Sequence, residues 1–79
     1  MIVSFTTTMG TRYHIDHANK QFVQETPKHR AGPLFNTPTV KIGKRVEIWT
    51  TDTDSKIRVI STAPVKLREV TLEQPVQQP

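Results

Sequence analysis

The chain has 79 residues, of which 34% are hydrophobic, and it carries a formal net charge of +4. This length suffices for one domain with a small core, and the lack of cysteine excludes disulfides, thiolate nucleophiles and cysteine-ligated zinc. Homodimerisation is the remaining ordinary way to stabilise so small a core, and the composition leaves it open.

β-branched residues dominate the composition. Thr, Val and Ile supply 26 residues, whereas Ala and Leu, which favour helices, supply six. We therefore predict a single all-β domain over residues 1–73. Its architecture would be one small, strongly bent antiparallel sheet or an SH3-like barrel of six to seven short strands. The polar segment 74–79 is predicted to be a flexible, disordered tail.

Three strands are predicted in the first third of the chain. They are separated by turns at Met9-Gly10 and at residues 18–20, where Asn19 tolerates the left-handed conformation. The strands expected are 2–8, 11–17 and 21–26. Residues 27–38 contain three prolines and are predicted to form a loop, with Leu34 and Phe35 as its anchor on the core.

The second half of the chain contains the clearest hairpin signal, in which residues 39–42 and 45–51 flank a Gly43-Lys44 turn. A polar turn at 52–55 and a strand at 56–62 are expected to follow. In the last segment, 65–73, the apolar positions change parity near Arg68-Glu69. A strand with a β-bulge would explain this change, and a short helical turn is the alternative.

Membrane and secretion signals are not recognisable in the sequence. No apolar run approaches the roughly 20 residues that span a bilayer. The first ten residues lack the charged and long apolar regions of a signal peptide. We therefore expect a cytoplasmic protein without membrane contact.

The histidines are candidates for a metal or catalytic site, but their spacing argues against both roles. On a strand, His14 and His17 point to opposite faces, so they cannot converge on one metal ion. Asp16 shares a face with His14 and could orient it, although Arg12 competes for that carboxylate. His29 lies in the distant loop. Phosphate-binding and nucleophile motifs are also lacking, so we expect no enzyme, metal or cofactor, and the role of the three histidines stays open.

Basic residues and a tryptophan are the strongest indication of a binding surface. Trp49 is out of phase with Val46 and Ile48, so it should face outward. Basic side chains that alternate with apolar ones should form a positive stripe on the outer face. The interface candidates are Lys41, Arg45, Trp49, Arg58, Lys66 and Arg68. Such a surface could bind a protein or stack nucleobases, unless Trp49 covers a second small core under the 27–38 loop.

Three segments carry a family resemblance: TTTMGTRYHID (6–16), IGKRVEI (42–48) and STAPVKLREV (61–70). Their order resembles small all-β accessory proteins of actinobacterial bacteriophages. The resemblance implies a small β-barrel-like domain that acts on a host protein or nucleic acid during infection, and it carries over no functional residues. The long proline-containing loop and the Gln/Pro-rich end depart from that pattern.

The function expected from the sequence is that of a non-enzymatic binding protein, namely a phage accessory factor acting on a host protein in the host cytoplasm. One alternative is a nucleic-acid-binding module that uses the basic stripe with Trp49. Another is a structural virion protein that assembles with itself. Nucleic-acid binding should weaken steeply with salt, whereas an apolar protein interface should tolerate it.

Overall fold

The computed structural model describes residues 1–71, which form seven β-strands and no helix. The strands are β1 (Ile2–Thr7), β2 (Arg12–Asp16), β3 (Gln21–Thr26), β4 (Arg30–Pro33), β5 (Glu47–Thr51), β6 (Ile57–Ser61) and β7 (Val65–Thr71). The prediction of an all-β fold is confirmed. Residues 1–71 therefore contain no helix that could span a membrane. The predicted tail at 74–79 and the domain end at residue 73 lie outside the described residues.

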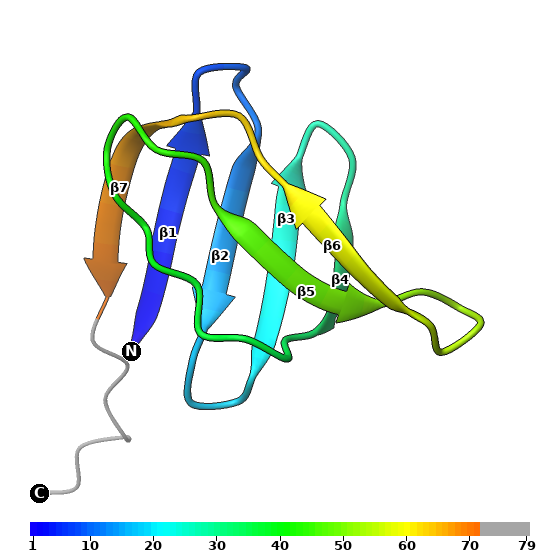
Figure 1. Ribbon diagram of the computed structural model, residues 1–79. Coiled ribbons are helices and arrows are strands. Elements are labelled where there is room, and N and C mark those ends of the chain that lie inside the picture. Colours follow the sequence, from blue (N-terminus) through cyan, green and yellow to red (C-terminus); the bar gives the residue numbers. More distant parts are fainter. Residues whose placement is uncertain (72–79) are drawn as a thin grey trace, which may run out of the picture.

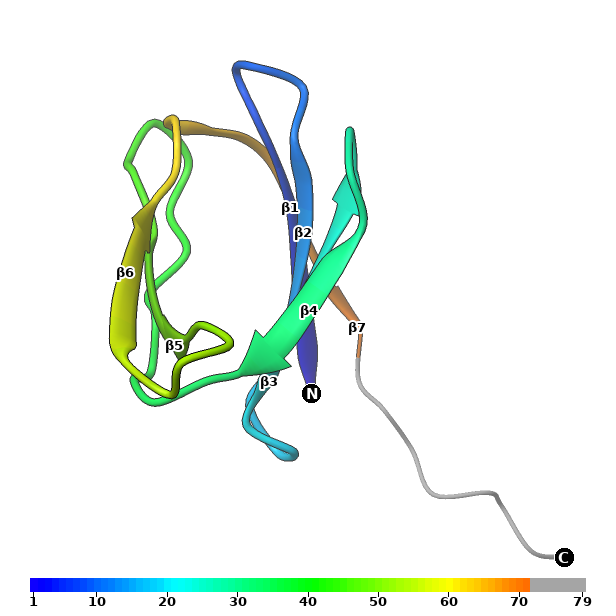
Figure 2. The ribbon, with the colours of Figure 1, turned by 90° about the vertical axis from the view of Figure 1, so that its right-hand side faces the viewer.

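The strands belong to two antiparallel sheets. Five strands pair in the order β4-β3-β2-β1-β7, and β5 pairs with β6 in a separate two-stranded sheet. Figure 1 shows the β5–β6 hairpin lying across the larger sheet, and Figure 2 shows the two sheets as facing layers. Strand β4 leads the chain from the first layer towards the second.

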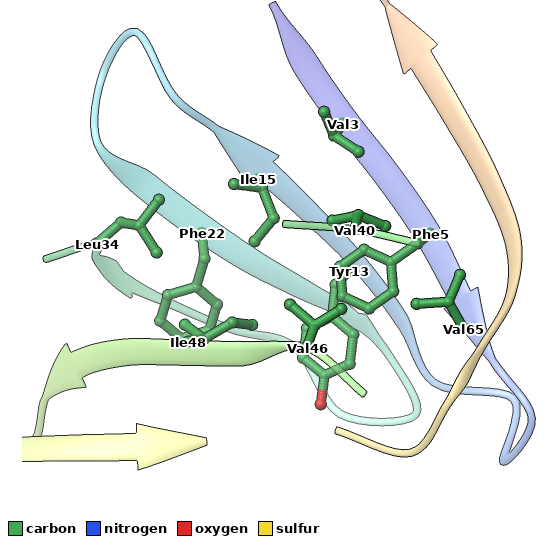
Figure 3. Packing of buried hydrophobic residues seen from close by; sticks show 10 residues of the cluster. All are labelled: Val3, Phe5, Tyr13, Ile15, Phe22, Leu34, Val40, Val46, Ile48 and Val65. Carbon is green, nitrogen blue, oxygen red and sulfur yellow. The ribbon is translucent and has the colours of Figure 1, made fainter. Parts of the chain in front are cut away.

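The hydrophobic core fills the space between the two layers (Figure 3). Alternate residues of β1, β2 and β3 point into it because neighbouring side chains on a strand face opposite ways. Phe5 and Tyr13 stack with ring centroids 5.1 Å apart. The buried hydrophobic residues are Val3, Phe5, Tyr13, Ile15, Phe22, Leu34, Val40, Val46, Ile48 and Val65.

The first three predicted strands are confirmed with small changes at their ends. Gly10 supplies the positive φ of 84° that the β1–β2 turn requires. In the turn before β3 the left-handed residue is Lys20, with φ 52°, and not Asn19. Asn19 contributes differently, because its backbone and side-chain N–H groups both donate to the Asp16 carboxylate.

The predicted hairpin of 39–42 with 45–51 is wrong. Residues 39–42 form no strand and make only an isolated bridge between Ile42 and Val65. β5 pairs with β6 instead. The 52–55 turn stabilises that pairing, because one Asp52 carboxylate oxygen accepts the backbone N–H groups of both Asp54 and Lys56.

The predicted 27–38 loop contains strand β4, which pairs with β3 from Gln21–Pro33 to Gln24–Arg30. Proline did not prevent this pairing, because Pro33 lies at the end of an edge strand. The expected anchor is half correct. Leu34 is buried, whereas Phe35 points away from the core and is 55% exposed.

Of the two structures predicted for segment 65–73, a bulged strand and a short helical turn, the bulged strand is the one observed in β7. The register against β1 shifts between Thr6, which pairs with Leu67, and Thr7, which pairs with Val65. Lys66 is therefore the extra residue, so the change of parity occurs there and not at Arg68-Glu69. As a result Val65 points into the core and Leu67 points to the opposite face.

Candidate functional site

Large apolar side chains gather on the outer face of the β5–β6 hairpin. Trp49 lies directly opposite Val59, and Ile57 is two pairs further along, on the same face. Their exposed fractions are 43%, 50% and 61%. Phe35 adjoins them, since its N–H donates to the Trp49 carbonyl at 2.9 Å. We call these four residues (Phe35, Trp49, Ile57 and Val59) the Trp49 face.

The backbone around Trp49 is fixed by Asn36. The Asn36 Oδ1 accepts the N–H of Trp49 at 3.0 Å, and its Nδ2 donates to the Glu47 carbonyl at 2.9 Å. This side of β5 is therefore paired with residues 35–36, while the other side is paired with β6. The aromatic ring thus projects from a backbone that is hydrogen-bonded on both sides.

The outward orientation predicted for Trp49 is confirmed. Val46 and Ile48 are buried, while Glu47 and Trp49 are exposed. Trp49 does not belong to the buried cluster. Aromatic residues surrounded by aliphatic ones are typical of the centre of protein interfaces, where they supply apolar area at low entropic cost. Sequence reasoning missed Ile57 and Val59, whose face depends on the pairing of β6 with β5.

The predicted alignment of the basic residues in one stripe on the outer face of the strands is wrong. Arg58 is paired with the buried Thr50 and Arg68 with the buried Phe5, so both arginines project from the core-facing side of their strands. Arg58 is also 3.4 Å from Asp52. Lys41 lies outside any strand, and Lys66 occupies the bulge.

Two of the predicted basic residues do come together. Lys41 and Arg68 line one surface groove of about 570 Å³, together with His17 and the apolar side chains of Val3 and Val40. Trp49 is not among its lining residues. Arg45 is elsewhere, with its guanidinium donating to the Thr62 carbonyl at 3.1 Å. The structure therefore separates the cationic groove from the Trp49 face.

His14 lies in a hydrogen-bonded chain on the opposite face of the large sheet. Its Nε2 is 2.6 Å from the Glu25 carboxylate, and its Nδ1 is 2.7 Å from the Ser4 hydroxyl. Arg12 joins the cluster by donating to Glu69 at 2.6 Å and by approaching Glu25 at 3.4 Å. The suggestion that Asp16 orients His14 is wrong, because the Asp16 carboxylate binds Asn19.

The order serine, histidine, carboxylate is that of a nucleophilic triad, but the surroundings of Ser4 do not suit acyl transfer. Acyl transfer also needs N–H donors aimed at the developing oxyanion. Ser4 lies on β1, whose backbone is paired with β2 on one side and β7 on the other, so the ladder uses these N–H groups. The charged side chains of Arg12, Glu25 and Glu69 instead connect β2, β3 and β7 across the sheet.

No group of three or more metal-ligating residues occurs within residues 1–71. His17 lines the groove described above, and His29 is exposed between β3 and β4. The absence of enzymatic activity stays a prediction from the sequence.

The Glu25 carboxylate makes the stability of the fold sensitive to acid. Its hydrogen bond with His14, aided by the charges of His14 and Arg12, holds the pKa of Glu25 below its ordinary value of 4.5. A lowered folded-state pKa stabilises the protein above the unfolded value, and this contribution is lost as the pH falls through the lowered pKa. Glu25→Gln should therefore lose less stability than the wild type between about pH 6 and about pH 3.

Thermal unfolding at a series of pH values measures this difference, with Glu47→Gln as the matched control. Glu47 is also exposed, and its carboxylate makes no ion pair among residues 1–71. Parallel pH profiles for wild type and Glu25→Gln would contradict the assignment.

Comparisons of the chain with protein-family models, with curated proteins and with solved structures gave no match.

Proposed function

We propose that this protein is a non-enzymatic binding protein that acts by occupying a partner protein through the Trp49 face. The observation that carries the proposal is the clustering of three exposed apolar side chains (Trp49, Ile57 and Val59) on one face of the β5–β6 hairpin, with the exposed Phe35 hydrogen-bonded to the Trp49 carbonyl beside them. Exposed apolar patches on small domains commonly mark interaction sites. The rigid backbone beneath Trp49 supports the proposal, because a preorganised aromatic anchor loses little entropy on binding.

The partner class follows from the resemblance to accessory proteins of actinobacterial bacteriophages. We propose a host protein, bound in the cytoplasm of the infected cell. The partner surface should be apolar at its centre to match Trp49, Ile57 and Val59. Neither a cofactor nor a metal enters this proposal.

Nucleic-acid binding is the second candidate, and the Lys41–Arg68 groove is the observation that favours it. Both cations line the same groove, and neither forms an ion pair within the described chain. Phosphate binding there would not require Trp49, because the groove and the Trp49 face have no lining residue in common. The virion-protein alternative requires extended self-assembly, which light scattering of the isolated protein would detect.

The test is a pull-down from actinobacterial host lysate, followed by titration of the isolated partner. Trp49→Ala should weaken binding at least tenfold, because truncating a central aromatic commonly costs more than about 1.4 kcal/mol. Leu67→Ala is the matched control, since Leu67 is 57% exposed on a different sheet.

Three outcomes separate the candidates. A partner that survives nuclease and moderate salt and depends on Trp49 supports the proposal. Binding that is equal for wild type and Trp49→Ala contradicts it. Recovery of nucleic acid that is lost at higher salt and on Lys41→Ala favours the cationic groove instead.

A further inference from the structure

We propose that two copies of this chain associate through their β6 strands, so that the two β5–β6 hairpins form one continuous four-stranded antiparallel sheet. The association is independent of the proposed host partner. Its basis is the unpaired outer edge of β6, together with the side chains that this edge would bring together.

The hydrogen-bond pattern identifies the free groups on β6. The Asp52 N–H donates to the Lys56 carbonyl, and the Thr62 N–H donates to the Val46 carbonyl. Hydrogen-bonded pairs alternate along an antiparallel ladder, so residues 56, 58, 60 and 62 direct their backbone groups towards β5. Ile57, Val59 and Ser61 therefore direct their N–H and C=O groups to the outer edge, where no described residue pairs with them.

Open edges on the larger sheet carry protection that β6 lacks. β4 is four residues long and ends in a proline, and β7 has a bulge at Lys66 followed by the charged Arg68 and Glu69. β6 has no proline and no bulge, Arg58 is its one charged residue, and three of its five side chains are aliphatic.

Charge and the number of paired residues favour one register between the two β6 strands. The hydrogen-bond ladder is complete only when the outward-directed residues of one strand lie opposite those of the other. Registers with the two-fold axis at residue 58, 59 or 60 meet this condition. An axis at Arg58 would place two guanidinium groups opposite each other, which is destabilising. An axis at Val59 pairs all five residues and places Arg58 opposite Ile60 of the second copy.

The axis at Val59 also joins the apolar faces of the two copies. Trp49 lies beside Val59 in each hairpin, so the four strands would carry an unbroken row of Trp49, Val59, Val59 and Trp49.

The experiment measures solution mass by sedimentation equilibrium over a concentration series, for wild type and two lysine variants. Val59→Lys places like charges opposite each other at the axis. Val70→Lys adds the same charge at a residue that is similarly exposed, at 43%, on β7. We expect wild type and Val70→Lys to reach twice the monomer mass of 9.0 kDa, and Val59→Lys to remain at 9.0 kDa.

A wild type that stays monomeric at millimolar concentration overturns the proposal, as does open-ended assembly beyond a dimer or a Val59→Lys variant that still dimerises. Amide hydrogen exchange of the wild type decides the matter if Val59→Lys does not fold. Protection of the Ile57, Val59 and Ser61 amides should fall on dilution, whereas that of Arg58 and Ile60 should not. Pull-down with wild type diluted below the concentration at which it dimerises tests host binding separately, because Val59 also belongs to the Trp49 face.

Discussion

Phe5→Ala is expected to destabilise the protein by about 3–5 kcal/mol and to leave much of the chain unfolded at 25 °C. Phe5 has no exposed surface and stacks on Tyr13 at the centre of the core. Alanine would remove this contact and leave a cavity that the paired strands on both sides of β1 cannot close. A domain of this length has a total free energy of unfolding of only about 4–12 kcal/mol.

Urea denaturation followed by circular dichroism measures the effect. Phe35→Ala is the matched control, because it makes the same chemical change at a side chain that is 55% exposed. The control should change the free energy of unfolding by less than about 1 kcal/mol. Equal destabilisation by both substitutions would mean that Phe5 is not central to the core.

Thr62→Val is expected to destabilise the protein by about 1–3 kcal/mol, although valine has nearly the same shape. The Thr62 hydroxyl accepts the backbone N–H of Val46 at 3.0 Å and donates to the Ala63 carbonyl at 2.7 Å. Thr62 is 3% and Val46 is 1% exposed, so valine would weaken the pairing of a buried N–H that water cannot reach. This contact holds the start of β5 against the end of β6.

Thr62→Ser tests the cause, because serine keeps the hydroxyl and loses only a methyl group. In the same denaturation measurement it should be closer to the wild type than Thr62→Val. If valine is the milder substitution, packing and not hydrogen bonding determines the requirement at this position.

Local patterns were enough to predict much of the fold. The alternation in residues 2–8, 11–17 and 21–26 predicts strands that the structure confirms, because one face of each is buried against the second layer. The outward direction of Trp49 follows from the same alternation. Each of these predictions depends only on neighbours in sequence.

Local patterns could not predict which strands pair with each other. The Gly43-Lys44 turn is real, and Gly43 has φ 84°, but its N–H bonds to the carbonyl of Val65, far along the chain. The segment before it therefore joins β7 and not β5. Likewise β4 is a strand only because β3 offers it a partner, in spite of the flanking prolines.

The candidate sites also depend on strand pairing that the sequence does not reveal. Phe35, Ile57 and Val59 join Trp49 because of the register between β5, β6 and the preceding loop. The partners of His14 come from two other strands, with Ser4 opposite it on β1 and Glu25 beside the irregular register of β2 and β3. Pairs formed between strands leave no signal in the spacing of one sequence.

The central position of β1 has a consequence for folding kinetics. Strands β1 to β4 form a meander of neighbours, but the second side of β1 is covered only by β7, where Ile2 pairs with Thr71 and Thr7 with Val65. This contact closes nearly the whole described chain into one loop, which slows folding. Until β7 docks, β1 presents an edge of unpaired backbone N–H and C=O groups, so the chain is prone to aggregate until this last pairing forms.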